Sequence, residues 1–475
     1  MTHWLSPARP YVIAHRGASA YAPDCSIEAY EKAARLGADF WEVDIRRAAC
    51  GTLVACHDAA LPDGRAIAEL TFDQLGAAAP AQGVSAVALA SILALAVEHD
   101  AGVYADIKDV DAALPVMAAL QAQGITRAIL GTFNPEAIAA LDAAQCPYPR
   151  AALVPVGVDP FEHARGAEII HLCWESLDQP QDLLTPAFFA KAAQLGQKVV
   201  LWHEEDPLRM ADLRHLPVLG ICSDRPEMVH PYSARDDAQI EIVCHRGAPE
   251  FAPENTVEGA ICAFGAGFDM VELDVHSLRD GTLAVIHDDS FDRTTDGCGR
   301  VAWSTVADCA KRDAGAWYSP HFTGTKVPDL DDILDVTRTH GGKLYVELKQ
   351  ADPDAVLAAV RAKGMMERCF FWSFDYQRLA ALRAAAPEAH IMIRRQDLPD
   401  LETALATLRP SILEFTVEED FSEFSRCRAA GVRPMIAYMG RDTAVFDKLL
   451  AAGPDLVNLH FPFLFRDHLR ARRET

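Results

Sequence analysis

The sequence lacks long apolar runs, paired cysteine motifs and any excess of positive charge. No apolar run approaches the roughly 18 residues that a membrane-spanning helix needs. The 12 cysteines stand singly, with no Cys-x-x-Cys, which favours reduced, small apolar side chains over disulfides or a zinc site. The first apolar run, at 11–14, follows no charged segment and apolar stretch of the secretory kind. We therefore expect no secretory signal and a cytoplasmic location.

The charge balance is strongly acidic. Lysine and arginine number 44 against 68 aspartates and glutamates, a net charge of −24. Such a chain repels nucleic acid and anionic membrane surfaces, so we expect no nucleic-acid partner and no integral membrane association. A small anionic substrate stays compatible with this charge, because a local cluster of cations can dominate its own pocket. The oligomeric state is left open by the sequence.

One set of motifs occurs twice, and every matched pair is offset by 230 residues. The first copy reads His15-Arg16-Gly17, Pro23-Asp24-Cys25-Ser26, Glu42-Val43-Asp44 and His57-Asp58. The second reads His245-Arg246-Gly247, Pro253-Glu254-Asn255-Thr256, Glu272-Leu273-Asp274 and His287-Asp288. Chance does not produce this shared register, so the chain contains an internal duplication.

The duplication predicts two domains, 1–235 and 238–475, with the polar stretch 226–239 as their linker. Within each half, short apolar runs alternate with helical patterns, which is typical of an α/β protein with a parallel sheet. The number of units predicts two tandem (β/α)₈ TIM-type barrels. A doubly wound sheet is the rival, weakened because no Gly-x-Gly-x-x-Gly follows the first run.

The first half offers nine apolar runs for eight barrel strands. They are 11–14, 40–45, 53–57, 102–107, 128–133, 152–156, 169–174, 198–202 and 218–222. We expect one of the runs between 152 and 174 to lie outside the barrel. The second copy carries 11 more residues between its His-Asp pair and its fourth strand, within 292–330. This loop follows a strand end, on the face where barrel active sites lie.

The repeated residues also indicate a chemistry. Residues i and i+2 of a strand share a face, so the acids of each Glu-x-Asp pair converge, as do Asp106 with Lys108 and Glu347 with Lys349. Three carboxylates suit a hard divalent cation, Mg²⁺ or Ca²⁺, better than zinc. Arginine and lysine beside such an ion suit a phosphoryl group, and two histidines suit a base and an acid.

Taken in this order, the motifs resemble the glycerophosphodiester phosphodiesterase family over nearly the whole chain. The resemblance implies TIM-type barrels and metal-dependent cleavage of a small glycerophosphodiester to glycerol 3-phosphate and an alcohol. It implies catalytic roles for His245, His287, His15 and His57, and phosphate binding by Arg246, Lys349, Arg16 and Lys108. It further implies metal binding by Glu272, Asp274, Glu347, Glu42, Asp44 and Asp106, with Glu254 and Asn255 in support.

Each copy departs from the family pattern in a different place. The first copy replaces an amide by Cys25 and shortens two acids, at Asp24 and Asp106. The second copy has His460 where the first has Asp224, and at an offset of 236 Tyr438 matches Trp202. We expect these second-copy changes to affect substrate shape more than proton transfer.

The departures assign the main activity to the second domain. They leave the first domain as a second enzyme or as a phosphate-binding or structural module. A further alternative is a lipid phosphodiesterase of the lysophospholipase D or sphingomyelinase D kind, which would need an apolar rim. Trp317, Tyr318 and Phe322 are the candidates for that rim, although packing in a core explains them better.

Overall fold

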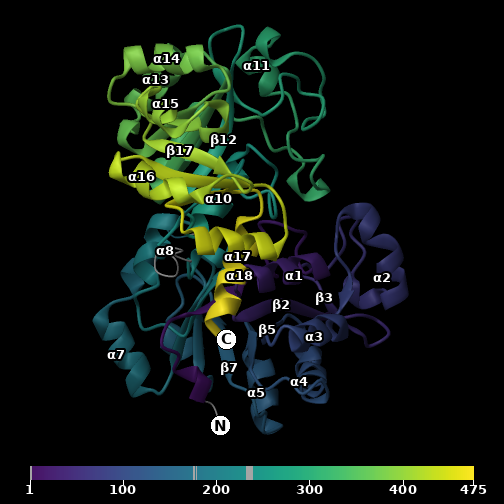
Figure 1. The fold of residues 1–475 in the computed structure, drawn as a ribbon. Helices are drawn as coiled ribbons and strands as arrows, with labels where there is room; N and C mark the ends of the chain where they lie inside the picture. Colours follow the sequence, from purple (N-terminus) through teal and green to yellow (C-terminus); the bar gives the residue numbers. More distant parts are fainter. Residues whose placement is uncertain (1–2, 175–176, 178, 232–238, 475) are drawn as a thin grey trace. The chain divides into compact units, whose positions relative to one another are not determined.

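The computed structural model describes residues 3–174, 177, 179–231 and 239–474. It divides into two compact units, Met1–His230 and Pro231–Thr475, which are coloured purple to teal and teal to yellow in Figure 1. The boundary expected between 235 and 238 lies outside the described residues. Each unit is described below by itself.

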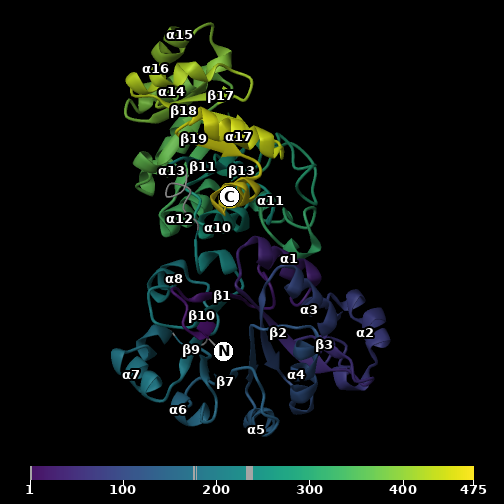
Figure 2. The same ribbon diagram turned by 60° about the horizontal axis from the view of Figure 1, so that its bottom comes forward.

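Unit 1 is a closed barrel of eight parallel strands. In barrel order these are β1 (Tyr11–Ala14), β2 (Phe40–Arg47), β5 (Gly102–Ile107), β6 (Ala128–Thr132), β7 (Arg150–Val154), β8 (Ile169–Leu172), β9 (Lys198–Leu201) and β10 (Gly220–Ser223). Pairing of β1 with both β10 and β2 closes the ring. The helices that surround it in Figure 2 are α1 (Ile27–Arg35), α3 (Leu89–Glu98), α4 (Ala113–Ala122), α5 (Pro135–Ala143), α6 (Pro160–His163), α7 (Pro186–Gln194) and α8 (Pro207–Leu213).

Unit 2 repeats this plan. Its barrel strands are β11 (Glu241–Cys244), β12 (Met270–Ser277), β14 (Lys343–Gln350), β15 (Cys369–Trp372), β16 (His390–Arg394), β17 (Ile412–Thr416), β18 (Arg433–Tyr438) and β19 (Leu456–Leu459). Its helices include α10 (Val257–Gly265), α12 (Leu330–His340), α13 (Pro353–Ala362), α14 (Tyr376–Ala385), α15 (Leu401–Ala406), α16 (Phe424–Ala429), α17 (Thr443–Ala452) and α18 (Pro462–Glu474). The prediction of two tandem (β/α)₈ barrels is confirmed.

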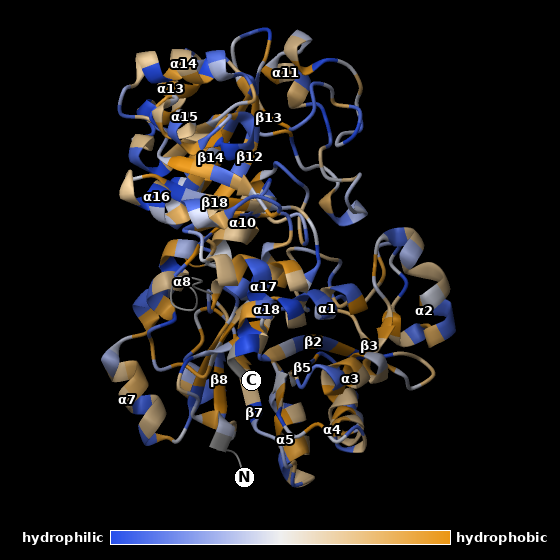
Figure 3. Ribbon diagram, viewed as in Figure 1, coloured by the Kyte–Doolittle hydropathy of each residue, from blue (hydrophilic) through white to orange (hydrophobic). Residues whose placement is uncertain are grey.

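Local sequence signals account for these elements. Most barrel strands are buried on both faces and read as largely apolar runs, seen as orange on strands such as β8 in Figure 3, whereas β2 and β12, which carry the acids, also show blue. Helices begin at capping side chains: Ser26 accepts a hydrogen bond from the Ala29 amide before α1, and Asp329 and Asp332 form a capping box before α12. Helix α12 ends at Gly341, whose φ of 73° suits glycine.

The expectation about the ninth apolar run was wrong. Strands β7 and β8, within 150–172, both belong to the barrel. The extra run is β3 (Leu53–Ala55), which pairs antiparallel with β2 outside the barrel, as β13 (Leu283–Val285) pairs with β12 in unit 2. A short hairpin strand buries the same kind of apolar residues as a barrel strand, so composition alone could not separate them.

The longer loop of unit 2 is a packed subdomain between β13 and α12. It contains α11 (Val306–Cys309) and three-residue helical turns at Val301–Trp303 and Pro320–Phe322, around a core that includes Phe291 and Val301. Phe322 is only 5% exposed and so offers no apolar rim, whereas Trp317 is 41% exposed. Among the described residues, no helix is both long and apolar enough to cross a membrane.

Candidate active site

The predicted acids converge at one end of each barrel. In unit 2, Glu272 and Asp274 lie two residues apart on β12, and Asp274 pairs in register with Glu347 on β14. One ligand oxygen from each of the three acids lies within 4.8 Å of the others, and all three side chains are buried. Glu42, Asp44 and Asp106 repeat the cluster in unit 1. Strand alternation and register therefore suffice to assemble both clusters.

A strained turn places the histidine and arginine of each His-Arg-Gly motif beside the acids. Arg246 has a φ of 59°, and its backbone amide donates to Glu272 Oε2 at 2.8 Å. Arg16, with a φ of 54°, makes the same bond to Glu42 at 2.8 Å. A Cβ atom on Gly17 would lie 2.7 Å from the backbone of Ala29, so the turn requires glycine. A left-handed arginine at the same place in both copies marks a functional constraint.

Two cations share the charge of the three acids in unit 2. The Arg246 guanidinium lies 3.4 Å from Asp274, and Lys349 Nζ lies 3.2 Å from Asp274 and 2.6 Å from Glu347. Burial, followed by repulsion from Asp274, raises the pKa of Glu272 well above its usual range and that of Glu347 to about 7. Burial acts in the same sense on Asp274, but Lys349 and Arg246 outweigh it and lower its pKa.

This charge balance fits a divalent cation. Three ionised acids facing two cations leave one negative charge in excess. Repulsion among the acids contributes to the raised pKa values of Glu272 and Glu347, because a proton on either acid removes a negative charge. A divalent cation would replace such a proton, and carboxylate oxygens are the ligands that Mg²⁺ and Ca²⁺ prefer. In unit 1, burial likewise raises the pKa of Asp106, to about 6.

Asn255 has a defined role that Cys25 cannot fill. The Asn255 amide donates to Asp274 Oδ2 at 2.8 Å and accepts from the Asp274 backbone amide at 3.1 Å. Asn255 and Cys25 both adopt a left-handed backbone conformation, with φ of 56° and 55°. In unit 1, Asp44 instead lies 2.9 Å from the Arg16 guanidinium. The cation therefore sits closer to the acid where the amide is missing.

The second histidine of each pair follows the short hairpin strand. His287 Nδ1 lies 2.6 Å from Asp288, and His57 Nδ1 lies 2.8 Å from Asp58. The His287 side chain lines a cleft of about 540 Å³ that also contains Glu347 and Lys349. Thus the structure brings His287 together with the acid and cation predicted to act with it.

Three residues that contact predicted site residues had not been assigned a role from the sequence. His276 Nε2 lies 3.2 Å from the His287 carbonyl, and Arg46, at the matching position of unit 1, donates to the His57 carbonyl at 2.8 and 3.0 Å. Arg293, in the longer loop, contacts the carboxylate of Asp288. The 230-residue offset of the motifs could have indicated position 276, but nothing local distinguishes Arg293.

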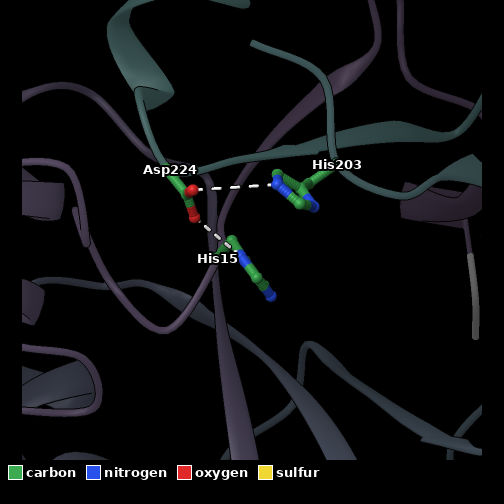
Figure 4. A group of neighbouring side chains, drawn as sticks. All are labelled: His15, His203 and Asp224. Carbon is green, nitrogen blue, oxygen red and sulfur yellow. Dashed lines mark hydrogen bonds and ion pairs between the residues drawn. The ribbon is translucent and has the colours of Figure 1, made fainter. Parts of the chain in front are cut away.

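Positions 224 and 460, which we expected to affect substrate shape more than proton transfer, each contact the first histidine of their unit. Asp224 accepts from His15 Nδ1 at 2.7 Å and from Ser19 Oγ at 2.7 Å, and its other oxygen lies 3.7 Å from His203 Nε2 (Figure 4). The two imidazole rings stack at 4.8 Å and 19°, so the carboxylate faces both. A nitrogen of either ring that carries a proton can donate it to this carboxylate, and the same three residues are also close enough together to hold a metal ion.

The first histidine of unit 2, His245, has a different partner. His245 Nδ1 lies 3.1 Å from His460 Nδ1, so an imidazole stands where unit 1 has a carboxylate. Burial and the nearby Arg246 lower the pKa of His245 to about 3. Position 460 therefore contacts the first histidine directly, as position 224 does in unit 1.

The inner walls of the two barrels also differ. Strand pairing aligns Leu201 with Ile436, so Trp202 corresponds to Ala437 and the expected match with Tyr438 was wrong. Trp202 packs 5.2 Å from the ring of His15, whereas Tyr438 packs outward on Phe446 of α17. A one-residue shift in the alignment of two strands moves every side chain to the opposite face, so an error of one residue changes which side chain lies inside the barrel.

The barrel wall formed by β7 and β8 in unit 1, and by β16 and β17 in unit 2, shows a second difference. Leu153 pairs with His171 in unit 1 and packs with Cys173 and Trp202, while Arg394 pairs with Glu414 in unit 2. The Arg394 guanidinium lies 5.2 Å from the exposed Phe374 ring, which also lies 5.7 Å from Lys349. One barrel thus has an apolar wall where the other has a cation.

Fold and site together define a (β/α)₈-barrel protein whose mouth collects acids, cations and histidines around space for an anion. Residues 15–228 and 245–408, well over half of the chain, match the model of the glycerophosphoryl diester phosphodiesterase family. The chain belongs to this family.

Individual relatives match one part of the chain at a time. A glycerophosphodiester phosphodiesterase of Bacillus subtilis is 38% identical over 139 residues, 26% of this chain and 47% of that protein. One from Caldanaerobacter subterraneus is 31% identical over 32% of this chain and 64% of its own. The chain thus spans about half to two thirds of these relatives' lengths.

Solved structures are matched over nearly their whole length by about half of this chain. A glycerophosphodiester phosphodiesterase from Agrobacterium tumefaciens is 37% identical, covering 48% of this chain and 99% of its own, with a TM-score of 0.46. An Oleispira antarctica phosphodiesterase, solved with the product sn-glycerol-3-phosphate, is 26% identical over 48% of this chain and 96% of its own, with a TM-score of 0.44.

Proposed function

We propose that this protein hydrolyses small glycerophosphodiesters to glycerol 3-phosphate and an alcohol, and that unit 2 carries most of the turnover. The observation that supports it is the cluster in unit 2, where two histidines, two cations and three buried acids gather at the ends of β11, β12, β13 and β14. Membership of the glycerophosphoryl diester phosphodiesterase family supports the same substrate class.

In the proposed reaction, a hydroxyl or water oxygen attacks phosphorus and the bond to the alcohol breaks. One of the two histidines, His245 or His287, accepts the proton of the attacking oxygen, and the other donates a proton to the departing alkoxide. Arg246 and Lys349 lie beside the acids, where they would balance the phosphate charge. Glu272, Asp274 and Glu347 would hold Mg²⁺ or Ca²⁺, which withdraws charge from phosphoryl oxygens.

Unit 1 has a second candidate role, as a phosphate-binding module with weaker or no turnover. In both units one lysine bridges two of the three presumed metal ligands, but it lies closer in unit 1: Lys108 Nζ is 2.7 Å from Asp44 and 2.5 Å from Asp106, against 3.2 and 2.6 Å for Lys349. His57 is 44% exposed, against 30% for His287. A more closely bridged acid cluster and a more exposed histidine support binding over catalysis in this unit.

We also propose a cytoplasmic location. The 12 cysteines are all free, and nine of them are buried as small apolar side chains. Thiols of this kind persist in a reducing compartment.

The test of the activity is a screen of the full-length protein with Mg²⁺ or Ca²⁺ against glycerophosphodiesters with different alcohols. Glycerol 3-phosphate should appear in equal amount to the free alcohol. If every such diester stays intact while another class of phosphodiester is cleaved, the proposed substrate class is wrong. If none is cleaved, the proposed activity is wrong.

A further inference from the structure

We propose that Arg293 is a positioning residue of unit 2, an inference that rests on the proposed function. Arg293 links the hydrogen-bonded pair His287 and Asp288 to the turn that contains Arg246. Arg293 Nε donates to Asp288 Oδ2 at 2.7 Å and its Nη2 to Asp288 Oδ1 at 3.1 Å. Its Nη2 and Nη1 also donate to the two oxygens of Glu254, at 2.7 and 3.0 Å. One guanidinium therefore binds two carboxylates, each through both oxygens.

Both carboxylates hold a residue of the presumed reaction. Asp288 accepts from His287 Nδ1 at 2.6 Å, and Glu254 accepts from Arg246 Nη1 at 2.9 Å. The result is a continuous series from the imidazole through Asp288, Arg293 and Glu254 to the arginine of the His-Arg-Gly turn. A planar guanidinium fixes the carboxylates in angle as well as distance, which a single ammonium cannot do.

The electrostatics of the series agree with this geometry. Hydrogen bonds from Arg293 and His287 hold the pKa of Asp288 well below its usual range, and those from Arg293 oppose the effect of burial on Glu254, whose pKa is also lowered. Both acids are thus kept as acceptors for the side chains that they orient. Arg293 is itself 42% exposed, so its value lies in alignment of the site more than in stability of the fold.

Unit 1 offers the internal comparison. Arg293 lies in the longer loop of unit 2, five residues after Asp288, and the shorter loop of unit 1 has Asp63 five residues after Asp58. Asp63 accepts from Arg65 and Gln82 at 3.0 and 2.9 Å. The Asp58 side chain is 79% exposed against 29% for Asp288, and Asp24 is 51% exposed against 10% for Glu254. The acids that contact His57 and Arg16 are thus more exposed than the two acids beside Arg293.

The experiment is a mutant cycle in the full-length protein, assayed for glycerol 3-phosphate release. Arg293→Met should lower kcat/KM by about 10- to 100-fold, the usual cost of losing a residue that orients a first contact, with both kcat and KM affected. In an Asp288→Asn/Glu254→Gln background, the same change should cost less than about threefold, because its partners are already altered. Arg300→Met, in the same loop, is the matched control and should stay within about twofold of wild type.

The outcomes separate the possibilities. A full loss in both backgrounds means that Arg293 contacts substrate directly, and no loss in either means that it is a surface ion pair; each overturns the proposal. If Arg293→Met does not fold, Arg293→Lys decides, since it keeps the charge without the fork: lowered kcat with an unchanged Tm supports alignment, and wild-type kcat refutes it. Absence of activity in the wild-type protein would instead refute the proposed function.

Discussion

The division of labour between the barrels can be tested with one pair of substitutions. His287→Ala removes the imidazole that lines the unit 2 cleft and whose Nδ1 is held by Asp288 at 2.6 Å. With Nδ1 engaged, Nε2 is the nitrogen available to the substrate. Loss of a positioned acid or base costs about 10²–10⁴ in rate, which is about 3–5 kcal/mol of barrier.

His57→Ala is the matched change in unit 1 and should alter the turnover of the full-length protein by less than about twofold. His57 belongs to a separate barrel, so the two effects should be independent. The residual activity of His287→Ala then has a direct meaning. A 100-fold loss limits the share of unit 1 to about 1% of the total.

The assay is steady-state release of glycerol 3-phosphate from one diester, with Tm measured for each variant to confirm folding. If His57→Ala removes most of the activity while His287→Ala leaves it intact, the assignment is reversed. The more complete motifs of unit 2 would then be a poor guide to the site of the reaction. Equal losses of about half from each change would show two active barrels.

Three further predictions follow from the same structure. Excess chelator should abolish activity and Mg²⁺ or Ca²⁺ restore it, whereas full activity in metal-free protein would exclude the role given to the acids. Expressed separately, 1–235 and 238–475 should each melt cooperatively; failure of both would show a shared core. Burial raises the pKa of Glu414 to about 7, so its contribution to stability is present below about pH 4.5 and is lost as pH rises through 7. Glu414→Gln should therefore stabilise the protein by roughly 1–3 kcal/mol at pH 8 and hardly at pH 4, as urea melts at the two pH values would show.

The sequence was informative wherever a residue's partners lie on the same or the adjacent strand. Alternation along β12 and its register with β14 bring Glu272, Asp274 and Glu347 together, and both relations follow from chain spacing. The duplication added a second, independent copy of the same pattern. Barrel closure followed from the number of strands that alternate with helices.

The remainder depends on contacts between distant segments. Asp224 contacts His15 across 209 residues of the chain. Arg293 contacts Glu254 from a long loop whose path the sequence does not predict. The one-residue shift between Trp202 and Tyr438 comes from strand register, which local composition does not determine. The hairpin strand β3 was mistaken for a barrel element because both bury apolar side chains.

The contrast at positions 224 and 460 has a consequence for how the duplicated chain could be altered. Unit 1 keeps a carboxylate beside its first histidine, while unit 2 keeps the amide of Asn255 on its acid cluster. Each barrel therefore has a polar group that the other lacks, at a position that can be aligned between the two copies. The substitution that would supply either barrel with its missing group can therefore be read from the matched position of the other barrel. The contacts that the group makes there are already described.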